Sequence, residues 1–200
     1  MSKNISYQTQ AIANYFHTNR IKWEQFYESE RKIIEQLGIN KEKTVLDIGC
    51  GCGGLGLTLK EKFGVRDYTG IEINSLAVIE AKKMNPDSTF CCGDIMDITH
   101  KEIKDKKYDL VFSLSCIDWN VLFEEMLAIA WSHVRPGGYF VSTFRLTDID
   151  GCDDIAKSYQ YINYEGKKEG EIAAYVVLNA GKLFDKLKNL DYSSINVYGY

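Results

Sequence analysis

Short apolar runs alternate with stretches of helical periodicity through most of the chain. Residues 44–48 form a β-branched and apolar run that glycines end abruptly, and from Leu55 onward the apolar residues recur at helical spacing. The same alternation then repeats, which predicts βαβ units and a parallel sheet with helices on both faces. The further strands expected are residues 67–73, 88–93, 108–113 and 139–144, with helices at residues 75–84 and 120–134 and a turn at residues 135–138.

The N-terminal part precedes this pattern. Residues 1–19 are polar and aromatic with weak periodicity, and residues 20–37 carry one apolar stripe that ends at Gly38, a favourable residue just past a helix. We expect residues 1–40 to form a helical lid that packs on the sheet edge or over the mouth of a site. Aromatic residues at this spacing also serve as plain packing. Those that would belong to the lid are Trp23, Phe26 and Tyr27.

The C-terminal part departs from the alternating pattern. Residues 146–178 are first acidic and then rich in Tyr and Lys. Loops after strand ends carry the site in sheets of this type, so we expect this segment to cover the substrate. Only one strand, residues 194–200, is expected after the last helix. Three explanations for the missing second strand stay open. The chain is shortened, or a strand from residues 159–178 takes its place, or the sheet edge is left open for a second copy of the chain, as in a homodimer. The inner strands expected are residues 159–164 and 173–178, and the helix is residues 180–190.

A glycine-rich turn between the first strand and the first helix is the centre of the predicted site. Such a turn lets the backbone approach a ligand closely and directs free N–H groups toward it. Gly49, Gly51 and Gly54 fit the G-x-G-x-x-G spacing of dinucleotide sites. Asp47 with Gly49, Gly51 and Gly53 fits D-x-G-x-G-x-G equally well. The turn therefore predicts a cofactor site without naming the cofactor.

Carboxylates also mark the ends of the neighbouring predicted strands, where ligands of such sheets bind. Glu72 ends the second strand and can accept hydrogen bonds from both ribose hydroxyls, unless it is a solvated strand-end residue. Asp94 follows the third strand and can accept an adenine amino group while Ile95 packs on the ring, or it caps its own turn. Asp47 would be costly to bury without a partner, so we expect it to accept backbone N–H groups of the glycine turn.

Length and charge restrict the class of protein. The 200 residues are 45% apolar, which is enough for one sizeable core, and we expect a single domain over residues 1–200. The formal net charge of −4 argues against a nucleic-acid partner, because phosphate binding requires Lys and Arg gathered on one face. The most basic stretch, residues 101–107, is interrupted by two acids and is interpreted as a solvated face.

The cysteines and the N-terminus indicate a reducing compartment. Six cysteines occur without a C-x-x-C pair, and most lie in or beside expected buried strands, where a thiol behaves as a small apolar side chain. We predict reduced cysteines that bind no metal. The N-terminus has no apolar signal segment, and no run of about 18 apolar residues is present to cross a bilayer. These features predict a cytoplasmic protein without a membrane partner.

Five successive motifs resemble those of the class I S-adenosylmethionine (SAM)-dependent methyltransferases. The motifs follow one another in the order and spacing of that family over about residues 40–145, and together they are far more specific than any one alone. The resemblance implies a Rossmann-like, doubly wound, mostly parallel sheet whose C-terminal antiparallel pair is incomplete here. It also implies SAM as cofactor and S-adenosylhomocysteine as product. The motifs are residues 45–53, 70–73, 92–95, 108–113 and 134–138.

The resemblance further implies the contacts to the cofactor. The glycine turn would line the methionine part of SAM, Glu72 would hold the ribose, and Asp94 with Ile95 would hold the adenine. Ser113, which ends the fourth strand, would lie beside the sulfonium and the incoming nucleophile. The N-terminal field of the first helix would favour the cofactor carboxylate. The full set of expected cofactor-binding residues is Asp47, Gly49, Cys50, Gly51, Glu72, Ile73, Asp94, Ile95 and Ser113.

The implied reaction is in-line displacement of the sulfonium methyl group by an O, N, S or C nucleophile. Alignment supplies much of the rate in such a reaction, so a general base is optional. Asp118, in the loop after the fourth strand, is the candidate to take a proton from the acceptor, although an N-cap for a helix at Asn120 fits equally. His17 qualifies only if the N-terminus folds over the site, and His133 is expected to pack or to face water.

Other features narrow the acceptor. Arg145 ends the fifth strand and would suit an anionic acceptor, but we rank a salt bridge with Asp148 or Asp150 first. Neither proline is followed by the residue that nucleic-acid methyltransferase motifs require. Leu114 stands where catechol-type enzymes place a metal-binding Asp, so metal assistance is not expected. The remaining class is a small-molecule or sugar-like acceptor.

Two other functions fit a sheet of this kind. One is an NAD(P)-dependent oxidoreductase, against which stand Asp47, Asp94 and the lack of a Tyr-x-x-x-Lys pair near the site. The other is a SAM-binding domain without catalytic activity.

Overall fold

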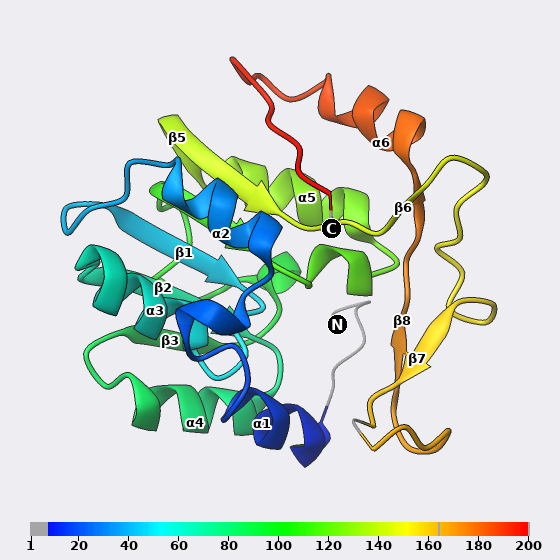
Figure 1. The fold of residues 1–200 in the computed structure, drawn as a ribbon, viewed down its shortest axis with the longest axis horizontal. Helices are drawn as coiled ribbons and strands as arrows, with labels where there is room; N and C mark the ends of the chain where they lie inside the picture. Colours follow the sequence, from blue (N-terminus) through cyan, green and yellow to red (C-terminus); the bar gives the residue numbers. More distant parts are fainter. Residues whose placement is uncertain (1–7, 164, 200) are drawn as a thin grey trace.

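The computed structural model describes residues 8–163 and 165–199, and a five-stranded sheet lies at its centre (Figure 1). All neighbouring strands run parallel, in the order β3-β2-β1-β4-β5. The predicted doubly wound, Rossmann-like α/β fold is therefore confirmed. The strands are β1 (Thr44–Ile48), β2 (Asp67–Glu72), β3 (Thr89–Cys92), β4 (Tyr108–Ser113) and β5 (Val134–Ser142).

Helices cover both faces of the sheet because successive strand residues point to opposite sides. In β1, Val45 belongs to the core under one set of helices, whereas Leu46 and Ile48 belong to the core under the other. The first set is α2 (Glu28–Glu35), α3 (Gly54–Phe63) and α4 (Ser75–Met84), and the second is α5 (Phe123–Ser132) and α6 (Ala180–Leu187). No helix within the described ranges is long and apolar enough to cross a membrane.

The N-terminal part is more broken than the single helix expected over residues 20–37. It contains α1 (Gln10–Phe16), the 3₁₀ turn η1 (Trp23–Gln25) and α2. Side chains that bind nearby backbone groups interrupt helical bonding here. Gln25 Oε1 accepts from the amides of Ile21 and Lys22, and Glu30 Oε2 accepts from Tyr27 N to start α2. Gly38, with φ +59°, marks the end of this helical part as predicted.

The region 135–138, expected as a turn, is instead the first half of β5. This strand begins at Val134 beside Tyr108 of β4, and the pairing shifts register before Leu110 meets Tyr139. A register shift of this kind is a β-bulge, which bends a strand without ending it.

The C-terminal part contains the expected antiparallel pair, as β7 (Tyr159–Tyr161) and β8 (Ile172–Ala174), with residue 164 outside the described residues. Two further short strands, β6 (Leu146–Thr147) and β9 (Leu178–Asn179), pair in parallel. The final strand expected over residues 194–200 is wrong for the described residues 194–199, which form no strand. This tail instead returns toward α2, where Tyr198 Oη donates to Gln36 Oε1 at 2.9 Å.

Candidate functional site

A cavity of about 930 Å³ opens at the carboxyl ends of the parallel strands. It lies at the end of β1. The chain adds β2 and β3 on one side of β1 and β4 and β5 on the other, so the strand order reverses at this point. Ligand sites of doubly wound sheets form at this switch point. Segments from both ends of the chain complete the wall, namely parts of residues 12–27, 160–175 and 197–199. Figure 1 shows the C-terminus and the β7–β8 pair converging on this side of the sheet.

The glycine turn forms the floor beside β1. Gly49 has φ +75°, and a Cβ atom at this position would collide with Cys116 Sγ. The backbone here takes a left-handed conformation that glycine adopts without strain. Gly49 N donates to Ile71 O at 2.8 Å and Gly51 N donates to Glu72 Oε2 at 3.0 Å. The turn is thus tied to the end of β2, and both Gly49 and Gly51 line the cavity.

Glu72 holds the turn and lines the cavity at the same time. Its second oxygen accepts from Asn74 N at 2.9 Å. Burial raises the pKa of this carboxyl, while backbone N–H groups of Asn74, Gly51 and Ile73 act in the opposite direction. The expectation that Asp47 would accept the amides of the turn is therefore corrected, because the amide of Gly51 bonds to Glu72 instead.

Asp47 is bound by a side chain rather than by the turn. Tyr68 Oη donates to Asp47 Oδ2 at 2.5 Å, and the carboxyl is 4% exposed. Burial raises its pKa to about 7, although the Tyr68 hydrogen bond and the nearby Arg20 lower it. Asp47 also lines the cavity, so its contact with a cofactor stays a prediction.

The predicted adenine side is assembled beyond β3. Asp94 Oδ1 accepts from Met96 N at 3.0 Å and caps the 3₁₀ turn η2 (Ile95–Asp97), so the turn-capping interpretation holds while the residue also lines the cavity. Ile95 is 3% exposed and lines the same wall. Cys50 and Ile73 line it as well.

Ser113 does not reach the cavity. It is fully buried at the end of β4, and the next residues, Leu114, Ser115 and Cys116, line the cavity instead. The expectation that Ser113 lies at the ligand site is therefore corrected, because the cavity wall begins at the residue that follows it.

Four further side chains form a second part of the wall, which we call the acceptor pocket: Asp118, Trp119, Arg145 and Tyr175. Arg145 Nη1 lies 3.2 Å from Asp118 Oδ2, so the expected salt bridge of Arg145 with Asp148 or Asp150 is wrong. The guanidinium carbon lies 4.2 Å from the ring centre of Trp119 and 3.9 Å from that of Tyr175. The cation lies against both aromatic rings, which pack edge to face with their centres 5.9 Å apart.

Asp118 is the one acid of the acceptor pocket, and one of its carboxylate oxygens lacks a hydrogen-bond partner among the described residues. The residue is 3% exposed, and that oxygen, Oδ1, is buried. Burial raises its pKa to about 6, while Arg145 acts to lower it. The alternative role as an N-cap is wrong, because Asn120 Oδ1 accepts from Leu122 N and α5 begins at Phe123.

The two candidate histidines lie away from this wall. His17 pairs with Glu80 at 3.6 Å, and His133 Nδ1 bonds to Lys106 O at 2.9 Å. Neither lines the cavity. Of the expected lid aromatics, Phe26 and Tyr27 line the cavity, whereas Trp23 packs on Phe63 with ring centres 5.8 Å apart.

Sequence reasoning missed the aromatic part of the acceptor pocket. Trp119 directly follows the candidate Asp118, and this adjacency was the one signal available. Tyr175 lies in the segment expected to cover the substrate, but nothing local connects it to Arg145. Further aromatic residues on the cavity wall are Tyr15, Phe16, Phe144, Tyr161 and Tyr198.

Comparisons with known proteins identify the family of the chain. A family model described as a methyltransferase domain matches residues 39–185. A phosphoethanolamine N-methyltransferase of Plasmodium falciparum is 30% identical over 139 residues, covering 66% of this chain and 50% of that protein. A malonyl-[acyl-carrier protein] O-methyltransferase of Priestia megaterium is 29% identical over 135 residues, covering 63% and 48%. The chain spans about half the length, or less, of the curated relatives it matches first.

Solved structures show the same fold at low identity. Streptomyces venezuelae DesVI aligns with a TM-score of 0.55 and 18% identity over 80% of each chain. The [4+2]-cyclase SpnF aligns with a TM-score of 0.59 and 17% identity, over 78% of this chain and 53% of that one.

The chain belongs to the methyltransferase domain family and has the fold of the class I SAM-dependent methyltransferases. SAM is the cofactor that this family implies, and the cavity fits it because Glu72 and Asp94 both line its wall beside the glycine turn. The NAD(P)-dependent alternative is thereby set aside.

Proposed function

We propose that the chain transfers the methyl group of SAM to a hydroxyl or amine of a small-molecule acceptor bound in the acceptor pocket. The observation that carries this proposal is the buried Oδ1 atom of Asp118, which has no partner in the described residues and belongs to a residue of the same cavity wall as Glu72 and Asp94. A buried carboxylate oxygen without a donor is costly, and a ligand hydroxyl or amine would supply that donor.

The cofactor half of the cavity needs no phosphate-binding groups. SAM supplies a methyl group that is already activated on a sulfonium. Glu72 would hold the ribose hydroxyls, Asp94 and Ile95 the adenine, and the turn from Gly49 to Gly51 the methionine part, with Asp47, Cys50 and Ile73 completing the wall. Because a negatively charged wall favours a cationic ligand, these acids suit the charge of the cofactor.

In the acceptor pocket, Asp118 would accept the hydrogen of the nucleophile and align it. Above about pH 6 the carboxyl is ionised and can also take the proton as the methyl group is transferred. Arg145 acts through Asp118: it holds one carboxylate oxygen and favours the ionised form. Trp119 and Tyr175 keep the guanidinium in place and exclude water, so the geometry of the nucleophile is set before the reaction.

The names of two relatives point to different nucleophiles, and only one of these carries a hydrogen that Asp118 could accept. One relative is named for an amine acceptor and another for a carboxyl acceptor. An ionised carboxyl nucleophile carries no hydrogen to donate, whereas an amine or a hydroxyl does. The unpartnered oxygen of Asp118 therefore favours an amine or a hydroxyl, including that of a sugar-like acceptor.

We treat residues 1–200 as one domain. Within it, a segment from each end of the chain would cover the cavity in which the reaction takes place. Of the predicted lid, residues 1–40, we assign residues 8–40 as a lid, because residues 1–7 lie outside the described residues, and we assign residues 146–178 as a substrate-covering insertion. In support, the Glu171 carboxylate accepts from the amides of Gln8, at 3.1 and 3.2 Å, and of Thr9, at 2.8 Å, joining the start of α1 to β8. Such a cover would exclude water from the aligned groups.

Transfer of label from methyl-labelled SAM to a fractionated metabolite extract tests the proposal. We expect one fraction to become labelled by the wild-type protein and by the control Asp153→Asn, which changes an exposed acid of the same insertion. Asp118→Asn should label the same fraction far more slowly. If SAM binds but no fraction is labelled, the chain is a SAM-binding domain without catalytic activity, and the proposal is wrong.

A further inference from the structure

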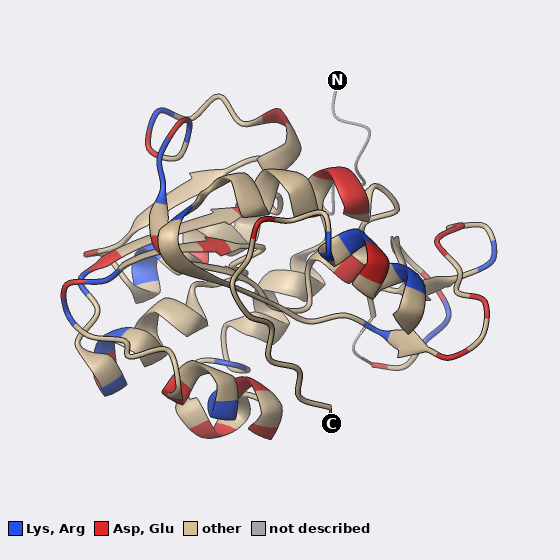
Figure 2. Ribbon diagram, turned by 90° about the horizontal axis from the view of Figure 1, so that it is seen from above, with Lys and Arg blue, Asp and Glu red and all other residues tan. Residues whose placement is uncertain are grey.

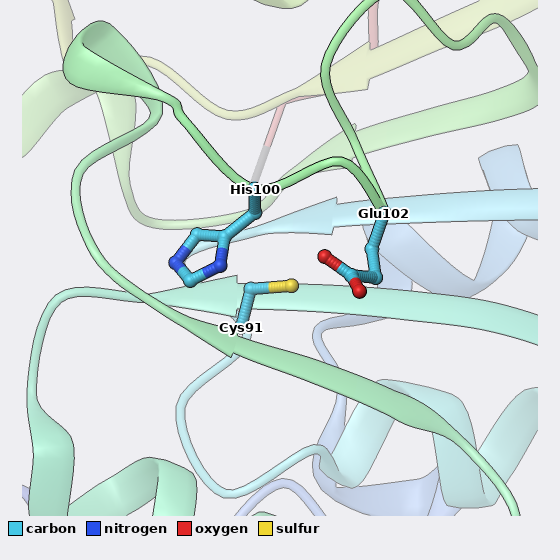
Figure 3. Close-up of side chains that lie close together, drawn as sticks. All are labelled: Cys91, His100 and Glu102. Carbon is cyan, nitrogen blue, oxygen red and sulfur yellow. The ribbon is translucent and has the colours of Figure 1, made fainter.

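Outside the cavity, three side chains with metal-binding atoms meet beside the edge strand β3 (Figure 3). Cys91, His100 and Glu102 each offer one ligand atom, and these atoms all lie within 4.8 Å of one another. Figure 3 shows the thiol, the imidazole and the carboxylate turned toward a common point. None of the three lines the cavity, so this cluster is separate from the methyltransferase site.

The imidazole of His100 is already in the form that binds a metal. One ring nitrogen, Nε2, lies 2.9 Å from the carbonyl oxygen of Cys92. A carbonyl only accepts hydrogen bonds, so Nε2 carries a proton, and in the neutral imidazole Nδ1 then keeps its lone pair. Metal-binding histidines are oriented in this way, with the second nitrogen donating to a backbone carbonyl or a carboxylate.

The chemistry of the three groups also suits a divalent ion. Cys91 is 5% exposed, and its thiol lies beside the carboxylate of Glu102 and the imidazole of His100. A bound divalent ion deprotonates a coordinating thiol. One thiolate, one carboxylate and one neutral imidazole then neutralise the two positive charges of the ion.

We propose that Cys91, His100 and Glu102 bind a divalent transition-metal ion, with zinc as the first choice. Sulfur, imidazole nitrogen and carboxylate oxygen are the zinc ligands of proteins, whereas magnesium and calcium prefer oxygen alone. Zinc bonds of about 2.0–2.3 Å require the three atoms to approach by roughly 1 Å, and water would occupy the fourth position. The proposal revises the expectation that the cysteines bind no metal.

The ion would join β3 to the loop that follows η2. Cys91 lies in β3, whereas His100 and Glu102 lie in the loop after Asp97. Closing this loop against β3 would stabilise Gly93, Asp94 and Ile95, which form the adenine side of the cavity. The site therefore stabilises the fold and supports cofactor binding without taking part in methyl transfer.

Cobalt(II) titration of the untagged protein tests the site, because thiolate coordination gives cobalt an intense charge-transfer band. We expect the band to saturate at one ion per chain in the wild type and in Cys92→Ser, a matched control that changes the exposed neighbouring thiol and keeps the carbonyl bonded to His100. Cys91→Ser should abolish the band, and His100→Gln should weaken ion binding at least roughly tenfold.

Zinc should also raise the unfolding temperature of the wild type and of Cys92→Ser but not of His100→Gln, a readout that does not depend on the cobalt band. A wild-type protein without the cobalt band, or a band of equal strength in Cys91→Ser, would overturn the proposal. Neither outcome depends on whether the chain transfers methyl groups.

Discussion

Arg145 contacts Asp118 twice. Its Nη1 atom lies 3.2 Å from Oδ2 of the carboxylate and 2.7 Å from the backbone carbonyl oxygen of the same residue. This double contact joins the end of β5 to the 3₁₀ turn η3 (Ile117–Trp119) after β4. It fixes one carboxylate oxygen and leaves Oδ1 without a partner in the described residues. The acceptor pocket is thus organised around one pair of charges that comes from two loops.

Replacing Asp118 by Asn should separate catalysis from cofactor binding. Asn keeps the size of the side chain but cannot take a proton, and general-base catalysis contributes about 10²- to 10⁴-fold. We expect kcat to fall on the order of 100-fold while SAM affinity, measured by calorimetry, changes little. A variant with wild-type kcat would show that Asp118 neither takes the proton nor aligns the nucleophile.

The pH dependence of kcat should report the ionisation of Asp118. Its pKa is raised to about 6, so the wild-type rate should decline as the pH falls through about 6, where the carboxyl becomes protonated. Arg145 lowers this pKa, so Arg145→Gln should move the decline to higher pH. Arg145→Lys, which keeps the charge, should move it less. A decline at the same pH in all three proteins would exclude Asp118 as the titrating group.

Asp47 should make the stability of the protein fall as the pH rises. Its pKa is about 7 in the folded chain and about 3.9 in an unfolded one. A carboxyl whose pKa is raised by folding stabilises the folded state fully below about pH 4, and this contribution is lost as the pH rises through about 7. Asp47→Asn, which can still accept from Tyr68, removes the titration.

Urea unfolding at pH 5 and pH 8 measures this effect. From pH 5 to pH 8 the free energy of unfolding of the wild type should fall by more than that of the variant. If the difference between the two proteins is the same at both pH values, Asp47 ionises normally in the folded chain.

The core of the fold was predictable because each element carries its own pattern. β1 and β4 are short apolar runs that are completely or almost completely buried, and the positive φ of Gly49 and Gly53 ends the first run where the glycines predict. The final strand was not predictable in the same way. Ile195 and Val197 alternate like strand residues, but their side chains are 45% and 60% exposed, and the tail crosses to the cavity instead of pairing.

Of the site, sequence reasoning reached the residues whose position follows from a strand end. Glu72 and Asp94 meet in the cavity because parallel strands end at one edge. The partner of Arg145 was misassigned to nearby acids because the contact with Asp118 spans 27 residues and depends on how two loops fold back. Local patterns contain no information on such contacts.

Removing the carboxylate of Glu171 should loosen the start of α1. Glu171→Ala removes hydrogen bonds to two backbone amides, an exposed arrangement worth about 1 kcal/mol. Hydrogen exchange should become faster over α1, and SAM should bind more weakly if this segment covers the cavity. Glu169→Ala, which changes an exposed acid nearby, is the control. Unchanged exchange in α1 would contradict the proposed cover.

Charged residues of both signs are spread over the outside of the molecule. Figure 2 shows Lys and Arg interspersed with Asp and Glu along the outer helices and loops. The charges that matter for the proposed reaction are those inside the cavity, and among these Glu72 belongs to the cofactor half.

Titration calorimetry of SAM against the wild type and Glu72→Gln tests most directly whether the strand-end carboxylates hold the cofactor. Gln can still accept from the amide of Gly51 with its one oxygen, whereas the amide of Asn74 loses its acceptor. The ribose would also lose a hydrogen bond to a charged group, worth about 1.5–3 kcal/mol. We expect SAM to bind the wild type and the surface control Glu42→Gln alike, to bind Glu72→Gln at least about tenfold more weakly, and NAD to give no heat. Equal SAM affinity in all three proteins, or preferential binding of NAD, would contradict the assignment of this cavity.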